Sequence, residues 1–381
     1  MIKKINKQQA KKYSKKIFDR YIIDAFTGMA KGLFVTLIAG TILELIGKGI
    51  SLGSVPLGNF VITISKIAKM LMGAGIGIGI ALQFKCNPTV IVTAAIAGMV
   101  GAFSYEIVAQ LTGLIPATKV ATMGALAKIK KLLPGDPIGA YVVSVIAIEL
   151  GQHVSKKIKL AVIGLPLFMF LYMAVGVFIA YPFVLLFKQL AKLIEAATTL
   201  APFTAGVVIS ITMGLLLTMP TSSAAIWISF ALNNETPAML LAGGAACAGC
   251  ACHMIGFAVA SYRENGWRGL VAQGLGTSML QIPNIMRNPA ILYPAVISSA
   301  IAGPFATVAF GLRSTAFGGG MGTSGLVGII ETISASKKII SAANLGLGIF
   351  VCFILIPTVI SFTVSEILRN RKVIKFGDMK L

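Results

Sequence analysis

The sequence predicts an all-α integral membrane protein with about ten membrane elements, arranged in two repeats and including re-entrant hairpins. Hydrophobic residues make up 56% of the chain and charged residues only 12%, and the mean hydropathy is +0.89. A soluble domain carries about one quarter charged residues. Apolar stretches recur between Leu33 and Ser365, and several reach the ~20 residues that a helix needs to cross a bilayer. Two examples are Leu160–Phe187 and Ala343–Ser365.

The formal net charge of +21 is concentrated at the chain ends and in loops. Eight cations precede residue 21, and five more lie between Arg369 and Lys380. Basic segments that flank membrane spans stay on the cytoplasmic side of the membrane, so we expect a multi-pass plasma-membrane protein with both termini cytoplasmic. The N-terminal cations are expected to rest on anionic membrane lipid. They do not indicate nucleic-acid binding, since interleaved aromatic residues are absent. The first twenty residues also lack the pattern of a cleavable signal peptide.

Weak internal similarity predicts that the chain is duplicated. Gly32 and Gly40 have the same separation as Gly206 and Gly214. Asn87-Pro88 leads into the Ala-Ile-Ala-Gly of 95–98, and Asn288-Pro289 leads into the same four residues at 300–303. About five elements in each unit would invert the second repeat relative to the first. The alternative is coincidence, because Gly and Ala match often in membrane sequences.

This pattern divides the chain into five regions. They are a basic cytoplasmic N-terminal segment at 1–27, a first membrane repeat at 28–187, a linker at 188–203, a second membrane repeat with the solute site at 204–367, and a basic cytoplasmic tail at 368–381.

The second repeat contains two interruptions of its helical pattern. Pro220 breaks an apolar run, since proline lacks a backbone donor and clashes with the preceding turn. The segment Gly311–Glu331 holds a dense glycine run that resists a regular helix. We interpret it as a re-entrant hairpin whose tip exposes backbone N–H groups and the hydroxyls of Thr323 and Ser324. The alternative is a flexible surface loop. Broken backbone at membrane depth is tolerated inside protein or around a wet cavity.

Ionisable and polar residues within apolar runs are candidates for function. Glu331 follows the glycine run, and a carboxylate there can accept paired hydrogen bonds from sugar-type hydroxyls. His253 fits either solute contact, a proton relay or a structural hydrogen bond. Glu149 and His153 share a helix face at i, i+4. They are either a functional pair or a pair at the end of a helix without a functional role. The candidate solute-binding residues are Glu331, His253, Thr221, Ser222, Ser223, Asn284, Arg287, Asn288, Gly322, Thr323 and Ser324, with Glu149, His153, Gln281 and Arg313 as secondary candidates. For the amides around Pro283 and Pro289, helix-end capping is the alternative.

Enzyme and metal signatures are weak. We find no catalytic constellation and no phosphate-binding Gly-x4-Gly-Lys-Ser/Thr loop, so we predict no catalytic residue and no cofactor. Cysteines at 247, 250 and 252 precede His253 in metal-like spacing, but they stand among Gly and Ala residues that favour close helix packing. We therefore expect no metal.

Four blocks of the second repeat resemble the enzyme IIC membrane subunits of the bacterial phosphotransferase system, with most similarity to the stand-alone, PfoR-like group. The blocks are Leu-Thr-Met-Pro-Thr-Ser-Ser at 217–223, the Gly/Ala/Cys block at 243–257, Gln-Ile-Pro-Asn-Ile-Met-Arg-Asn-Pro at 281–289 and Gly-Met-Gly-Thr-Ser-Gly-Leu-Val-Gly at 320–328. The family has a Gly-Ile-Thr-Glu-like stretch whose glutamate contacts sugar, and residues 328–331 match it except at Ile330. A membrane histidine also contacts sugar in the family, and His253 is the nearest counterpart.

The resemblance implies a homodimer that binds a sugar or polyol and exposes it to separate enzyme IIA and IIB subunits for phosphorylation. The chain itself would be at most the membrane subunit of a sugar phosphotransferase system, with no phosphoryl-carrying residue. We expect it to translocate the solute by alternating access. Two rival functions are a secondary transporter uncoupled from phosphorylation and a membrane sensor or regulator without transport. A membrane enzyme is a third, disfavoured by the missing catalytic groups.

Overall fold

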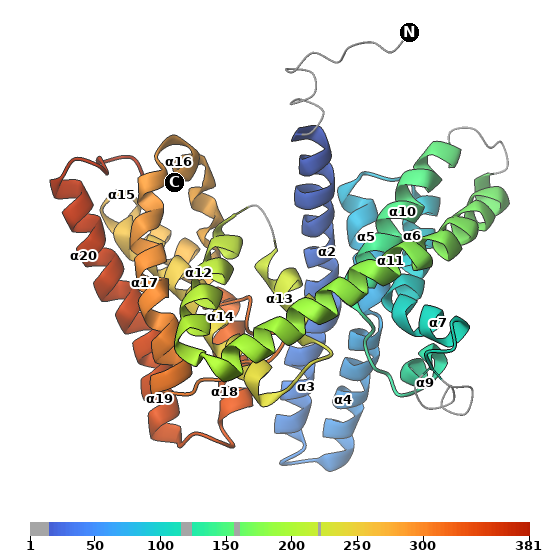
Figure 1. Cartoon of the computed structure of the whole chain (residues 1–381), viewed down its shortest axis with the longest axis horizontal. Coiled ribbons are helices and arrows are strands. Elements are labelled where there is room, and N and C mark those ends of the chain that lie inside the picture. Colours follow the sequence, from blue (N-terminus) through green and yellow to red (C-terminus); the bar gives the residue numbers. More distant parts are fainter. Residues whose placement is uncertain (1–14, 116–123, 156–160, 220–221) are drawn as a thin grey trace, which may run out of the picture. The chain divides into compact units, whose positions relative to one another are not determined.

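The computed structural model describes residues 15–115, 124–155, 161–219 and 222–381, and every regular element in these ranges is helical (Figure 1). By its internal contacts the chain splits into two compact units, unit 1 at Met1–Phe187 and unit 2 at Lys188–Leu381. The division falls at the end of the predicted first repeat.

Within the described residues, six helices are long and apolar enough to cross a membrane, or up to eight spans if each of two bent helix pairs counts as one. The pairs Val55–Met70 with Met72–Gln83 and Pro88–Ala102 with Ser104–Leu111 bend by 53° and 56°. Two shorter apolar helices, Pro202–Thr218 and Ser324–Ser336, accompany them. The predicted all-α membrane fold is confirmed. The six candidate spans are Lys15–Ile50, Pro137–Ser155, Gly164–Leu200, Pro237–Ala260, Pro289–Ala309 and Ala342–Asn370.

Unit 1 is held together by glycine contacts between helices. Its described elements are η1 (Asp19–Asp24), α2 (Ala25–Leu33), η2 (Phe34–Ile38), α3 (Ala39–Ile50), α4 (Val55–Met70), α5 (Met72–Gln83), α6 (Pro88–Ala102), α7 (Ser104–Leu111), α9 (Ala125–Lys130), α10 (Pro137–Ser155) and α11 (Ala161–Leu200), whose last residues belong to unit 2. A Cβ at Gly32 would overlap the backbone of Gly75, and one at Gly98 would overlap Gly73. Helices α2, α5 and α6 therefore pack backbone to backbone.

Unit 2 is built around α14, which is buried along most of its length. Its described elements are α12 (Pro202–Thr218), α13 (Ser223–Ala231), α14 (Pro237–Ala260), α15 (Tyr262–Val271), η4 (Ala272–Gly276), η5 (Ser278–Gln281), α16 (Ile282–Arg287), η6 (Pro289–Leu292), α17 (Tyr293–Pro304), η7 (Phe305–Ala309), η8 (Ser324–Leu326), α18 (Val327–Ser336), α19 (Ala342–Phe350), η9 (Val351–Leu355) and α20 (Ile356–Asn370). Small residues allow α12, α17 and α20 to approach α14 closely. A Cβ at Gly249 would overlap the carbonyl oxygen of Ser210 on α12.

Both predicted interruptions coincide with breaks between helices. Helix α12 ends at Thr218 and α13 begins at Ser223, although Pro220 and Thr221 lie outside the described residues. The glycine-rich stretch forms turns without a regular helix until η8 begins at Ser324. These breaks bring non-helical backbone into unit 2 next to α14, where its polar groups need partners.

Candidate functional site

The residues Gly318–Gly322, which we call the glycine loop, lie against three polar side chains of unit 2. The Ser223 hydroxyl donates to the carbonyl oxygen of Gly320 at 2.7 Å. A Cβ at Gly319 would overlap the indole Nε1 of Trp227, and one at Gly318 would crowd the side chain of Glu331. Only glycine leaves room for this approach. The two interrupted segments predicted from sequence therefore meet, one through Ser223 and the other through the glycine loop.

Glu331 lies on α18 and is only 4% exposed. The Thr315 hydroxyl donates to its Oε2 atom at 2.6 Å. Ser314 and Thr332 lie beside the thiol of Cys247 on α14. A buried carboxylate needs hydrogen-bond donors or an opposite charge, because desolvation of the ionised form is costly. The Thr315 hydroxyl is one such donor to Glu331.

Several buried polar atoms next to the glycine loop have no hydrogen-bond partner among the described residues. They are Nε1 of Trp227, and Oγ of Ser314 and Oγ1 of Thr332, which lie beside the weakly accepting thiol of Cys247. Most buried polar groups in proteins are hydrogen-bonded, so each unpaired one needs an explanation. These atoms and the Glu331 carboxylate form a buried polar cluster around one loop.

His253 forms a second polar cluster on α14. Its Nδ1 lies 2.8 Å from the Thr218 hydroxyl, which in turn lies 2.9 Å from the hydroxyl of Ser278. The imidazole is fully buried against Gly214, and its Nε2 has no partner among the described residues. One ring nitrogen is thus fixed by the protein, and the other is left for a further contact.

The two clusters lie on different faces of α14. Cys247, beside Glu331, and His253 are six residues apart, which is about 9 Å along the helix axis. Cys250 lies between them, and its thiol donates weakly to carbonyl oxygens of Met213 and Gly319. Helix α14 therefore carries polar contacts from the glycine loop on one face to the histidine on another.

Comparison with known proteins decides the family. A family model described as Phosphotransferase system, EIIC matches residues 23–381, which is nearly the whole chain. The chain belongs to the phosphotransferase system EIIC family. No curated protein matches it. The predicted family is thereby confirmed, and the chain is a multi-pass plasma-membrane carrier of the phosphotransferase type, acting on a small-molecule solute.

In this EIIC protein, the hydroxyls of Thr323 and Ser324 are used within the fold. Thr323 donates to the carbonyl oxygen of Gly274 at 2.6 Å, and Ser324 donates to that of Gly276 at 3.0 Å. Thr323 is 3% exposed, in contrast to the exposed hairpin tip expected from the sequence. The reason is that carbonyl groups at the end of η4 require donors. Gly322 has a φ of +56° and packs against Cys250.

The predicted amides contact the C-terminal tail of the EIIC chain. Asn284 donates to the carbonyl oxygen of Lys380 at 2.9 Å, and Asn288 donates to that of Val373 at 2.9 Å. Gln281 donates to the carbonyl oxygen of Met379 at 2.9 Å. These amides could bind a solute only if the tail moved away from them, because they donate to its carbonyl oxygens.

The remaining candidates are dispersed. Ser222 caps α13 by accepting from the N–H of Ala225, and Arg287 is exposed at the end of α16. The backbone of Arg313 exchanges hydrogen bonds with the Ser336 hydroxyl. In unit 1, Glu149 pairs with Arg20, and His153 contacts the backbone oxygen of Glu149 at 3.0 Å instead of its carboxylate. Thr221 lies outside the described residues.

Sequence reasoning missed Trp227 and Thr315 as members of the site. Trp227 is one of two tryptophans in the chain and follows the Pro220 break, which is the signal that could have identified it. Thr315 lies between Arg313 and the glycine run, but only the fold shows that it faces Glu331.

No group of three or more His, Cys, Asp or Glu side chains close enough to hold a metal ion occurs in the part of the chain that the structure describes. The three cysteines of α14 are buried and form no disulfide among the described residues, and their thiols point to backbone carbonyl groups. The described geometry gives this segment a role in packing.

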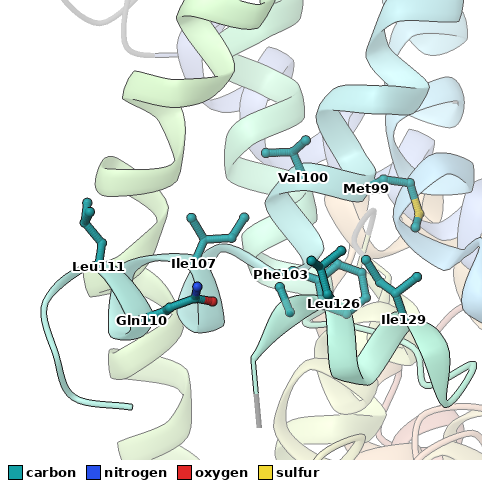
Figure 2. A pocket seen from close by; sticks show the side chains of 9 residues that line it. Met99, Val100, Phe103, Ile107, Gln110, Leu111, Leu126 and Ile129 are labelled. Atoms are coloured by element: carbon teal, nitrogen blue, oxygen red, sulfur yellow. The ribbon is translucent and has the colours of Figure 1, made fainter. Parts of the chain in front are cut away.

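Unit 1 has a pocket of about 730 Å³ between α6, α7 and α9, shown in Figure 2. Its nine described lining residues include Phe103, Ile107 and Leu126, and Gln110 is the one polar side chain among these nine. A sugar has several hydroxyls that each need a partner, so this lining does not suit such a solute. None of the predicted site residues lines this pocket.

Proposed function

We propose that this EIIC protein binds a sugar or related polyol beside the glycine loop of unit 2 and translocates it by alternating access. The observation that carries the proposal is the buried Glu331 carboxylate lying across the glycine loop from the unpartnered indole N–H of Trp227. Separate IIA and IIB subunits would then phosphorylate the solute on the cytoplasmic side.

The chemistry of the loop suits a polyol. A carboxylate accepts hydrogen bonds from two neighbouring hydroxyls, while an indole N–H donates to a hydroxyl oxygen. The hydroxyls of Ser314 and Thr332 can do either. A ligand with several hydroxyls would therefore satisfy groups that the described protein leaves unpaired. Hydrogen bonds to a charged group contribute about 1.5–3 kcal/mol, more than those between neutral groups.

His253 is proposed as a second contact or as a proton relay. Thr218 fixes one side of the imidazole, so the orientation of Nε2 is set before a ligand arrives. Because His253 on α14 and Glu331 on α18 adjoin different faces of α14, we assign them to successive positions of the solute. A relay and a solute contact both require the partner-free Nε2.

The assembly is also proposed from sequence and family. The proposed homodimer follows from membership in the family, and the proposed cytoplasmic termini follow from the basic ends of the chain. The two inverted repeats are proposed from the internal similarity of the sequence. Support for the repeats comes from matching helix starts: Asn87 accepts from the N–H of Val90, and Asn288 accepts from that of Ala290, each directly before a proline. The five regions predicted from sequence remain the proposed domain organisation.

Uptake into proteoliposomes tests the proposed function. The purified protein is reconstituted into vesicles that enclose IIA and IIB subunits with a phosphoryl donor, and a radiolabelled sugar is added outside. We expect uptake that depends on these partners and a phosphorylated product inside. The matched control is the Glu195→Gln variant, which changes a carboxylate of unit 2 that accepts only from Asn234 in the described contacts.

Two other outcomes would overturn the coupling to phosphorylation. Proton-dependent uptake without any partner protein would identify a secondary transporter. Specific solute binding without flux would identify a sensor or regulator, the role implied by similarity to the PfoR-like group.

A further inference from the structure

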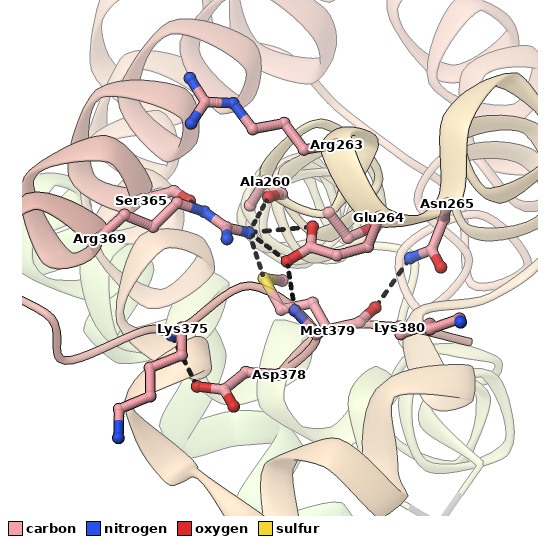
Figure 3. Close-up of polar contacts among 12 residues, drawn as sticks. Ala260, Arg263, Glu264, Asn265, Ser365, Arg369, Lys375, Asp378, Met379 and Lys380 are labelled. Carbon is pink, nitrogen blue, oxygen red and sulfur yellow. Dashed lines mark hydrogen bonds and ion pairs between the residues drawn. The ribbon is translucent and has the colours of Figure 1, made fainter.

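The C-terminal tail of unit 2, residues 373–381, is folded back onto α15 and α16 (Figure 3). Asn265 donates to the carbonyl oxygen of Met379 at 2.8 Å and accepts from the N–H of Leu381 at 2.8 Å. Ile374 and Met379 are buried, with exposed fractions of 2% and 0%. The tail therefore has a defined position in unit 2, and so do the charged residues that it carries.

A buried ion pair anchors the start of this tail. Arg369 pairs with Glu264 at 2.9 Å, and the two side chains are 9% and 0% exposed. The same guanidinium donates to the carbonyl oxygen of Ala260, the last residue of α14. Arg369 thus joins the ends of α14 and α20, and its charge is neutralised locally.

Next to this ion pair lies a basic pocket of about 370 Å³. Its lining residues are Arg263, Arg369, Lys372, Ile374, Lys375 and Phe376. Arg263 pairs with Glu366 at 2.9 Å, whereas neither Lys372 nor Lys375 forms an ion pair with any described residue. After the two pairs are accounted for, the pocket keeps the positive charge of two exposed lysines.

Asp378 forms no ion pair with these lysines among the described residues, although the charge of Lys375 acts on its carboxylate. Its carboxylate accepts from the backbone N–H of Lys375 and from the side chain of Asn288, both at 2.8 Å. The hydrogen bond from the Lys375 N–H, with that from Asn288, holds the pKa of Asp378 below its usual range. The carboxylate is therefore engaged in fixing the tail, and the Lys375 side chain projects away from it in Figure 3.

Lys372 occupies a strained backbone position at the end of α20. Its φ is +58°, in the left-handed region where glycine or asparagine is normally found after a helix. This conformation costs about 1 kcal/mol for other residues. A lysine held there places a cation at the negative end of the helix dipole, at the rim of the pocket.

The pocket lies where two candidate membrane spans end. Helix α14 ends at Ala260 and α20 at Asn370, and every lining residue follows one of these ends or directly precedes it. Phe376 is 77% exposed, and Trp267 on α15 is 70% exposed. Exposed aromatic rings together with cations are typical of the membrane interface.

We propose that this pocket binds the phosphate of an anionic phospholipid headgroup. Lys372 and Lys375 hold the phosphate, and the exposed ring of Phe376 contacts the adjoining glycerol and acyl region. The apolar part of the lining favours a lipid over free phosphate, which gains nothing from an exposed phenyl ring. This site is independent of the solute site around the glycine loop.

Native mass spectrometry of the full chain in detergent tests this site, using dihexanoyl phosphatidylglycerol and dihexanoyl phosphatidylcholine as probes. The test variant combines Lys372→Asn, which retains a residue tolerant of positive φ, with Lys375→Gln. The control combines Lys337→Gln with Lys338→Gln, two exposed lysines between α18 and α19. We expect about thirty-fold weaker phosphatidylglycerol binding in the test variant, from about 1 kcal/mol per cation, and unchanged binding in the control.

A second measurement does not depend on the variants. The preference of the unmodified protein for phosphatidylglycerol over phosphatidylcholine should fall as salt is raised, because the lysines are exposed. Equal binding of both lipids, or an equal loss in both double variants, would overturn the proposal. Displacement of the lipid by an equal concentration of inorganic phosphate would also overturn it, since it would indicate a free-anion site.

Discussion

At the scale of single residues, the indole N–H of Trp227 is buried against Gly319 without an acceptor among the described residues. The ring is 1% exposed and packs in an apolar cluster with Met213, Leu217 and Ala231. Leucine or phenylalanine would fill such a cluster without an unpaired polar atom. The presence of tryptophan therefore points to a use for its N–H group.

Replacement of Trp227 by Phe should weaken solute binding about tenfold, because one neutral hydrogen bond contributes about 1 kcal/mol or slightly more. The smaller ring should also lower the stability of unit 2 modestly. Solute affinity is measured by titration, and unfolding is followed separately by heating. Trp267→Phe is the matched control, since that ring is 70% exposed, and neither property should change. Wild-type affinity in the Trp227 variant would remove the indole from the site.

At the scale of elements, α14 is positioned by glycine contacts that leave no room for a methyl group. Gly249 meets the backbone of Ser210 on α12, and Gly244 meets that of Leu312. In a membrane, helices associate through close packing and polar contacts, since lipid tails are as apolar as the side chains. The glycines of α14 therefore set the distance at which the glycine loop and His253 are held.

Substitution of Gly249 by Ala should destabilise the fold by about 1–3 kcal/mol, because the new methyl group meets a backbone carbonyl that cannot rotate away. Gly346→Ala on α19 is the control. A Cβ there has nothing within 4 Å, and alanine should stabilise the helix by about 0.5–1 kcal/mol. Thermal unfolding of both variants in the same detergent measures the difference. Equal melting temperatures would show that the packing at Gly249 is not tight.

At the scale of the whole molecule, the membrane class and the family follow from the sequence, because composition and motif blocks are local properties. The breaks near Pro220 and in the glycine run were predictable for the same reason. Their contact through Ser223 and Gly320 depends on the fold, and the local pattern does not predict it. The use of Asn284 and Asn288 to hold the tail was not predictable, since an amide near a helix end has the same appearance whether it binds solute or backbone. Thr315 was missed as a partner of Glu331 because that contact depends on how the glycine loop folds against α18.

The central claim is that Glu331 binds the solute. Purified protein is screened against sugars, polyols and organic acids by ligand-induced stabilisation, and the best ligand is titrated into the wild type, Glu331→Gln and the control Glu195→Gln. Because a hydrogen bond to a carboxylate contributes about 1.5–3 kcal/mol, the Glu331 variant should lose at least about tenfold in affinity while its melting temperature changes little. The control should bind as the wild type does. Unchanged affinity in Glu331→Gln would contradict the account.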